Sequence, residues 1–251
     1  MNKKKITVLI PIHDEKIDFL EKSIQSLINQ SYEDWECLII FEGNNKENLT
    51  YLNRIKKNDR RFKVVIPEKK LGLAGSLNLG LDLANTKYIA RFDSDDIMHK
   101  NRLVNQLNFL ENNLNISVVG SNLKIINNKH KVIGTRKYPE NGKKLLFNFS
   151  LRCGLAHPSV MFRLKDVISV GMYNDKLERA EDLDLWLRMI KRGFRFYNIQ
   201  KELVLFRKNK FRPKKHWLNV YKVRKQNNGI FYSLYEKTIL FFFKLLIIIK
   251  N

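Results

Sequence analysis

Apolar and polar positions alternate along the first hundred residues in a way that predicts strands and helices in turn. Short apolar runs rich in β-branched residues predict buried strands, and apolar residues spaced three or four positions apart predict helices. The expected strands are Ile6–Ile12, Trp35–Phe41, Phe62–Ile66 and Tyr88–Phe92, and the expected helices are Asp18–Asn29, Leu49–Lys57 and Ser76–Ala84. This alternation is typical of an α/β protein whose mostly parallel sheet is flanked by helices.

The second half of the sequence is less regular. Two short strands are expected at Ser117–Val119 and Leu123–Ile126, and a helix at Leu183–Ile190. From about Phe211 the chain becomes strongly basic and then apolar. We therefore expect one domain over residues 1–210 and a basic, amphipathic, helical extension over residues 211–251.

Composition and charge narrow the classes of protein that fit. The 251 residues are 44% hydrophobic and 29% charged, which is globular composition. Lysine and arginine number 47 against 25 acidic residues, giving a net charge of +22 that favours anionic partners. No helix-turn-helix or RNA-recognition signature is visible, so we expect no nucleic-acid partner.

Cysteines and apolar stretches indicate the compartment. Cys37 and Cys153 form neither a disulfide framework nor a zinc-binding spacing, which favours a reducing cytoplasm. The basic N-terminus leads into a short apolar run broken by Pro11, which is not the pattern of a signal peptide. Ile239–Ile249 contains Lys244 and falls short of the roughly 20 apolar residues needed to span a bilayer.

Polar residues follow three of the expected strands directly, in the loops His13–Lys16, Glu42–Asn45 and Asp93–Asp96. Ligands of parallel sheets bind beyond the carboxyl ends of the strands, so these loops are the expected site. Asp93 and Asp95 can share one face of an extended segment and, together with Asp96, suit a hard divalent cation. Helix N-terminal acids before Ile97 are the alternative interpretation.

Two further segments carry weaker signals. Glu181 and Asp182 open an apolar helix, where a carboxylate can cap the N-terminus, act as a general base, or do both. The run Leu71–Gly80 is rich in small residues before a helix and lacks the spacing of a dinucleotide or phosphate loop. A turn of this kind can still approach a phosphate.

Five motifs in the same order resemble the family-2 glycosyltransferases with the GT-A fold, a Rossmann-like nucleotide-diphospho-sugar transferase architecture. The matching segments, spread over about residues 5–207, are Val8–Glu15, Ser26–Tyr32, the Asp-x-Asp segment Tyr88–Asp96, Cys153–Arg163 and the Glu-Asp-x-Asp-Leu-Trp segment Glu181–Arg188. Cys153–Arg163 resembles the amylovoran-type branch that builds bacterial exopolysaccharide, capsule and lipopolysaccharide.

The resemblance implies a role for each matched position. A nucleotide-binding half over residues 1–100 would bind the donor, and an acceptor half over residues 101–210 would bind the acceptor. Donor-binding residues are Pro11, Ile12, His13, Glu15, Glu42, Asn78, Asp93 and Ser94. Asp95 with Asp93 would bind Mn²⁺ or Mg²⁺, Asp182 would be the general base, and His157, Glu181 and Trp186 would lie on the acceptor side.

The resemblance also implies a reaction and partners. An aspartate at position 182 indicates inversion at the anomeric carbon, with a UDP-sugar as donor and UDP-galactose favoured among the hexoses. The acceptor would be a saccharide carried on a lipid. The extension would then lie on the anionic inner face of the plasma membrane, and packing on the protein or on a second copy is the alternative. Nothing in the sequence indicates an oligomeric state.

Three departures from the family pattern leave a second interpretation open. Phe41-Glu42-Gly43-Asn44 replaces Asp-Asp-Gly-Ser, His13 replaces a tyrosine, and Asn209 replaces a histidine. A catalytically impaired GT-A scaffold that binds sugar nucleotides is therefore the alternative. A nucleotidyltransferase fits less well because the first strand is not followed by a Gly-rich loop with Lys or Arg.

Overall fold

A computed structural model describes residues 4–151, 153–208 and 214–227 of the chain. Four parallel strands form one half of the sheet in the order β3-β2-β1-β4. Their bounds are Ile6–Ile12 (β1), Trp35–Phe41 (β2), Phe62–Val65 (β3) and Tyr88–Arg91 (β4). All four strands expected from the sequence are confirmed.

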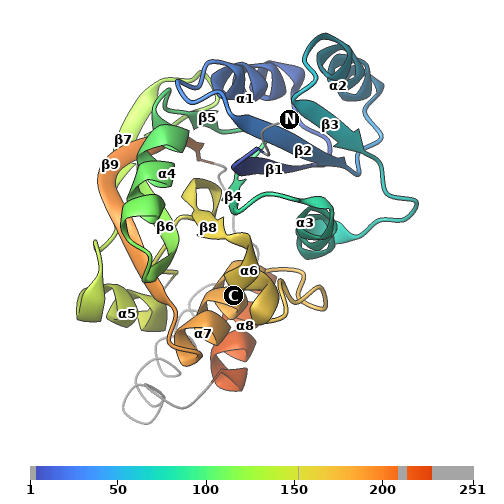
Figure 1. Ribbon diagram of the computed structural model, residues 1–251. Helices are drawn as coiled ribbons and strands as arrows, with labels where there is room; N and C mark the ends of the chain where they lie inside the picture. Colours follow the sequence, from blue (N-terminus) through green and yellow to red (C-terminus); the bar gives the residue numbers. More distant parts are fainter. Residues whose placement is uncertain (1–3, 152, 209–213, 228–251) are drawn as a thin grey trace.

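Helices cover both faces of this half of the sheet (Figure 1). They are α1 (Ile17–Ile28), α2 (Lys46–Asn58) and α3 (Gly72–Leu83). Because side chains alternate along a strand, Val8 and Ile10 pack in the core that includes α1 and α2, whereas Leu9 packs in the core that includes α3. The α/β class expected from the sequence is confirmed.

The second half continues the same sheet in mixed directions, in the order β4-β8-β6-β9-β5, with β7 also paired to β6. Its strands are β5 (Ile97–Met98), β6 (Ile116–Ile126), β7 (Val132–Arg136), β8 (Met161–Arg163) and β9 (Arg195–Arg207). Its helices are α4 (Arg102–Asn112), α5 (Gly142–Leu151), η1 (His157–Ser159), α6 (Leu164–Ser169), α7 (Glu181–Lys191) and α8 (Lys214–Gln226).

The sequence prediction of two short strands at 117–119 and 123–126 is wrong, because both belong to the single strand β6. Gly120, Ser121 and Asn122 interrupt the apolar pattern, yet the strand continues through them. An added Cβ on Gly120 would lie 2.4 Å from Asn198 Oδ1 of the neighbouring strand β9. A small residue is therefore required where the two strands approach each other.

The described part of the C-terminal extension packs on the domain. Val220 and Val223 of α8 are buried in the core that includes α7, and Asn227 Nδ2 donates to Asp184 Oδ1 at 3.2 Å. Residues 209–213 and 228–251, including Asn209 and the apolar segment 239–249, lie outside the described residues. Among the helices that are described, none combines the length and apolar character that crossing a membrane requires.

Candidate functional site

The loops that follow β1 and β2 are locked together at the carboxyl edge of the sheet. Asp14 Oδ1 accepts hydrogen bonds from the backbone N–H groups of Asn44 (2.8 Å) and Asn45 (2.9 Å). An added Cβ on Gly43 would lie 2.0 Å from the carbonyl oxygen of His13. Glycine is therefore needed at position 43 for the two loops to come this close.

Glu42 stabilises the N-terminus of α3. Its Oε2 accepts from the N–H groups of Leu71 and Gly72, both at 3.1 Å, and Ser76 Oγ donates to its Oε1. A carboxylate here satisfies N–H groups that have no partner inside the helix and interacts favourably with the helix dipole. The glycine-rich run thus forms the start of α3. The backbone N–H groups of Leu71 and Gly72 at its beginning already have Glu42 as a partner.

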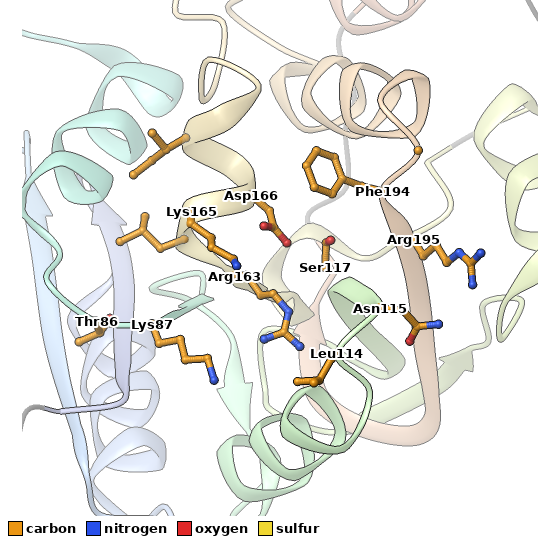
Figure 2. A pocket seen from close by; sticks show the side chains of 13 residues that line it. Thr86, Lys87, Leu114, Asn115, Ser117, Arg163, Lys165, Asp166, Phe194 and Arg195 are labelled. Atoms are coloured by element: carbon orange, nitrogen blue, oxygen red, sulfur yellow. The ribbon is translucent and has the colours of Figure 1, made fainter.

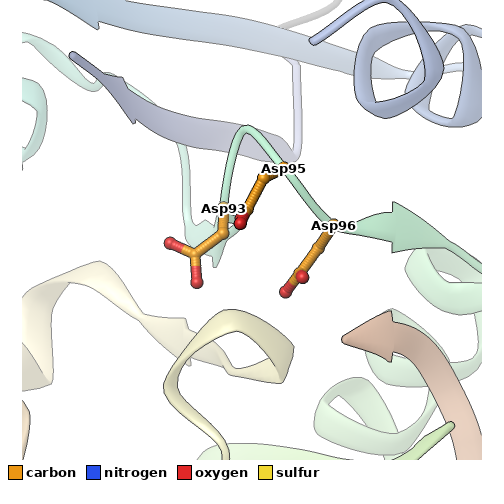
Figure 3. A group of neighbouring side chains, drawn as sticks. All are labelled: Asp93, Asp95 and Asp96. Atoms are coloured by element: carbon orange, nitrogen blue, oxygen red, sulfur yellow. The ribbon is translucent and has the colours of Figure 1, made fainter. Parts of the chain in front are cut away.

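Three carboxylates gather on the short loop between β4 and β5. Asp93, Asp95 and Asp96 each place a carboxylate oxygen within 4.8 Å of the others, and Figure 3 shows their side chains on the same side of the loop. Ile97 begins strand β5, so the alternative interpretation of these residues as helix N-terminal acids is wrong.

Asp96 supplies the strongest indication of a cation in this cluster. Its side chain is fully buried, Oδ1 accepts from the Arg207 N–H at 2.7 Å, and Oδ2 has no hydrogen-bond partner among the residues that the structure describes. Burial, followed by the charges of Asp93 and Asp95, raises the pKa of Asp96 well above its usual value. A divalent cation would offset both the cost of burying the Asp96 charge and the repulsion from Asp93 and Asp95. The residues therefore fit a metal ion with oxygen ligands.

A buried arginine lies behind the carboxylates. Arg91 Nη2 contacts Asp93 Oδ1 at 2.6 Å, and its side chain is only 4% exposed. Burial acts to lower the Arg91 pKa, but the charge of Asp93 and its hydrogen bond, with the charges of Tyr173 and Glu181, raise this pKa overall. Arg91 belongs to the Asp-x-Asp segment, but the sequence pattern does not indicate its role, because a buried cation is not expected in an apolar strand.

Glu15 and Ser94 lie beside Asp93. Burial raises the pKa of Glu15 and the Asp93 charge acts in the same direction, whereas a hydrogen bond with Ser94 opposes the shift. His13 is more exposed, with 60% of its side chain accessible. Glu15 is therefore close to both Asp93 and Ser94, and the His13 charge also acts on it.

Asn78 connects two parts of the site. Its Nδ2 donates to the Tyr173 carbonyl at 2.8 Å, and its Oδ1 accepts from the Tyr173 N–H at 2.9 Å. The amide is thereby used to hold the loop that carries Tyr173 against α3.

The expected acceptor residues form a buried cluster around His157. His157 Nε2 lies 2.9 Å from Tyr173 Oη, and Nδ1 lies 3.9 Å from Glu181 Oε1. Burial and the Arg91 charge lower the pKa of His157 well below its usual value, so the ring is neutral. Trp186 has no exposed surface and packs edge-on against His157, so it supports the position of the His157 ring.

The two acids at the start of α7 have different environments. Ala180 is the N-cap residue, with φ of 64°, so neither Glu181 nor Asp182 occupies the capping position. Burial, followed by the Asp182 charge, raises the pKa of Glu181 to about 7. Asp182 is half-buried; its Oδ1 accepts from the Leu183 N–H at 2.7 Å, and the Cys153 thiol donates to its Oδ2 at 3.6 Å.

A cavity of 980 Å³ lies at the opposite edge of the sheet (Figure 2). It is lined at the amino end of β4 by Thr86 and Lys87, at the start of β6 by Ser117, and at the start of β9 by Arg195. Parallel-sheet sites form at the carboxyl ends of strands, where Asp93 lies. This cavity is therefore separate from the candidate site.

Comparison with known proteins identifies the group of sequences that the chain resembles. A family model described as glycosyl transferase family 2 matches residues 7–169. The chain is 29% identical over 213 residues to the uncharacterized glycosyltransferase MJ1057 of Methanocaldococcus jannaschii, covering 82% of this chain and 72% of that protein. It is 31% identical over 211 residues to the putative glycosyltransferase EpsE of Bacillus subtilis, covering 82% and 73%. Two other relatives are longer, and the matched region covers only 28% and 33% of their lengths.

The fold is also similar to a solved structure. The S. aureus TarS 1–349 structure in complex with UDP-GlcNAc superposes with a TM-score of 0.70 at 18% identity. The match covers 89% of this chain and 65% of that one. At this identity the likeness establishes the shared fold.

Proposed function

The chain belongs to glycosyl transferase family 2, and from that premise we propose that it transfers a hexose from a UDP-sugar to a saccharide hydroxyl with inversion. The observation that carries the proposal is the pairing of two acidic groups. Asp93, Asp95 and Asp96 gather beyond β4, and Glu181 and Asp182 open α7. The two groups are near each other, because the charges of Asp93 and Glu181 both act on Arg91 and the Asp93 charge also acts on Glu181. One group suits the donor diphosphate and the other suits an acceptor hydroxyl.

The donor would lie along the carboxyl edge of β1, β2 and β4. Pro11, Ile12, His13, Glu15, Asp93 and Ser94 are the proposed contacts, whereas Glu42 and Asn78 would shape the pocket by holding α3 in place. A UDP-sugar is supported by the shared fold of a protein solved with UDP-GlcNAc. UDP-galactose is the first hexose donor to test, because the Cys153–Arg163 motif resembles the exopolysaccharide branch.

Asp95 and Asp93 are the proposed ligands of Mn²⁺ or Mg²⁺, and Asp96 lies close enough to join them. When bound, the ion would supply positive charge against the negative charge that develops on the departing diphosphate. Arg91 holds Asp93 in place by its 2.6 Å ion pair. Asp96 Oδ2, which is buried and has no hydrogen-bond partner within the described part of the chain, is the observation that favours a cation here.

Asp182 is the proposed general base. It would accept the proton of the acceptor hydroxyl as that oxygen bonds to the anomeric carbon, while the bond from this carbon to the diphosphate oxygen breaks and its electron pair leaves with the nucleotide. Attack from the opposite face inverts the anomeric centre. Half-buried Asp182 is more accessible than Glu181, although the Glu181 pKa of about 7 makes it the second candidate for this role.

We further propose that the product is bacterial surface polysaccharide and that the acceptor is lipid-linked. The net charge of +22 supports association with an anionic membrane surface, and the proposed location is peripheral, on the cytoplasmic face. For residues 214–226, the packing of Val220 and Val223 on the domain supports the alternative interpretation, in which the extension packs on the protein itself. The membrane role is therefore proposed for residues 228–251, as part of an extension that begins near residue 211.

A thermal-shift panel tests the donor assignment. Wild type and Asp95→Ala are mixed with UDP-galactose, UDP-glucose, UDP-N-acetylhexosamines or UDP, each with Mn²⁺, Mg²⁺ or EDTA. We expect one sugar nucleotide to raise the unfolding temperature of wild type only when a metal is present, and Asp95→Ala to lose that response. Absence of any response would contradict the donor assignment. A metal-dependent response without release of UDP in the presence of acceptor would favour the impaired-scaffold alternative, to which the departures at Glu42 and Asn209 point.

A further inference from the structure

Arg207, the last residue of β9, supports the carboxylate loop from behind. Its backbone N–H donates to Asp96 Oδ1 at 2.7 Å, and its Nε donates to the Asp95 carbonyl at 2.8 Å. One residue therefore fixes both the Asp95 backbone and the Asp96 side chain. Arg207 is only 1% exposed, so its guanidinium interacts with other groups of the protein and not with solvent.

The guanidinium is itself held by the turn between β6 and β7. Nη1 donates to the Asn127 carbonyl at 2.9 Å, and Nη2 lies 3.0 Å from His130 Nδ1. The Arg207 Cζ also lies 3.7 Å from the centre of the Phe19 ring, which the His130 ring meets edge-on at 5.7 Å. Arg207 is thus fixed from α1 and from the turn.

The partners of His130 determine its tautomer. A guanidinium only donates hydrogen bonds, so Nδ1 of His130 must accept the bond from Arg207. The proton of the neutral ring then lies on Nε2, which donates to Asp18 Oδ2 at 2.7 Å. Asp18, in the first turn of α1, therefore fixes the ring in the tautomer that Arg207 requires.

The backbone of the turn holds His130 in this place. His130 has a φ of 59°, in the left-handed region that residues other than glycine seldom adopt, although asparagine, aspartate and histidine adopt it more often than the rest. Asn127 Oδ1 accepts from the N–H groups of Lys129 (2.9 Å) and Lys131 (3.1 Å) and so closes the turn. A backbone conformation that is unfavourable in energy persists where the surrounding structure requires it.

We propose that His130 is a positioning residue for the metal-binding carboxylates. Through Arg207 it holds the Asp95 backbone and the Asp96 side chain in the arrangement that binds the cation, and Asp18 orients its ring. This inference rests on the proposed function, because it assigns His130 to the same site. Residue 130 lies outside all the motifs that carry the family resemblance.

Binding of Mn²⁺ in the presence of UDP tests the inference without requiring turnover. Free Mn²⁺ is measured by electron paramagnetic resonance during titration of wild type, His130→Gly, His130→Asn and Lys129→Ala. Glycine and asparagine both tolerate a positive φ, but only asparagine offers an oxygen near the position of Nδ1. Lys129 lies in the same turn, and its exposed side chain is outside this contact network.

We expect His130→Gly to bind Mn²⁺ about tenfold more weakly than wild type, in the range typical of residues that orient metal ligands. His130→Asn should recover most of the affinity, and Lys129→Ala should match wild type. Thermal unfolding without metal confirms that each variant is folded.

Two outcomes would separate the inference from the proposed function. If wild type binds no Mn²⁺ with UDP present, the metal assignment fails and the role of His130 fails with it. If wild type binds Mn²⁺ but folded His130→Gly binds it equally well, or His130→Asn is as weak as His130→Gly, the metal assignment stands and the positioning role is overturned.

Discussion

At the scale of single residues, burial gives neighbouring acids different chemical properties. Glu181 and Asp182 are adjacent in the sequence, yet Glu181 is 6% exposed whereas Asp182 is half-buried. Burial disfavours the charged form of a carboxyl group, which accounts for the Glu181 pKa of about 7. Near neutral pH Glu181 is therefore partly protonated.

Glu181 should make the stability of the protein depend on pH. Its pKa rises from the ordinary 4.5 to about 7 on folding, so between these values the folded state holds a proton that the unfolded state releases. The free energy of unfolding should therefore fall as pH rises from about 4.5 to about 7, by an amount on the order of a few kcal/mol. Urea unfolding across this range measures the change.

Glu181→Gln should remove this contribution and flatten the profile over the same range. The matched control is Glu47→Gln, since Glu47 is exposed in the first turn of α2 and should leave the profile unchanged. An identical pH dependence in Glu181→Gln and wild type would show that Glu181 has an ordinary pKa.

At the scale of secondary-structure elements, α3 depends on a residue that follows β2. Glu42 accepts hydrogen bonds from two backbone N–H groups and from the Ser76 hydroxyl at the start of the helix. Glu42→Ala should lower the free energy of unfolding by about 1–2 kcal/mol, the range typical of a lost helix cap. Chemical denaturation measures the loss, and Glu68→Ala, an exposed acid in the loop before α3, is the control.

Sugar-nucleotide binding should weaken in Glu42→Ala, because α3 and the Asn78–Tyr173 contact border the proposed pocket. Unfolding that matches Glu68→Ala would contradict the capping role.

Elements whose pattern is continuous and apolar were predicted well from the sequence. β1 and β2 have the predicted bounds, since every residue of these strands except Pro11 and Glu36 is buried. β9 was not predicted, because Gln200, Lys201 and Glu202 interrupt its apolar residues where its register with β6 shifts. Helix α3 begins four residues before the predicted start, because the Glu42 contacts that stabilise its first turn come from elsewhere in the sequence.

At the scale of the whole molecule, the sheet brings residues far apart in the sequence to one edge. The carboxylate cluster was predictable because its members lie within four residues of one another. Arg207 and His130 were not predictable as parts of the site, because they are 77 positions apart and meet only when β9 returns beside β6. Contacts of this kind depend on tertiary packing, which local sequence patterns do not contain.

The central claim is that the site at the carboxyl ends of the strands catalyses sugar transfer. In this site a metal ion is bound by Asp95 and a proton is accepted by Asp182. The most direct test of this claim is release of UDP from the donor identified by thermal shift, measured with a saccharide acceptor and Mn²⁺ for wild type, Asp182→Asn and Glu181→Gln. We predict release by wild type that EDTA abolishes and that Asp182→Asn reduces by about 10²–10⁴-fold, with a smaller reduction in Glu181→Gln. Wild-type rates in Asp182→Asn, or release that is unaffected by EDTA, would contradict the account.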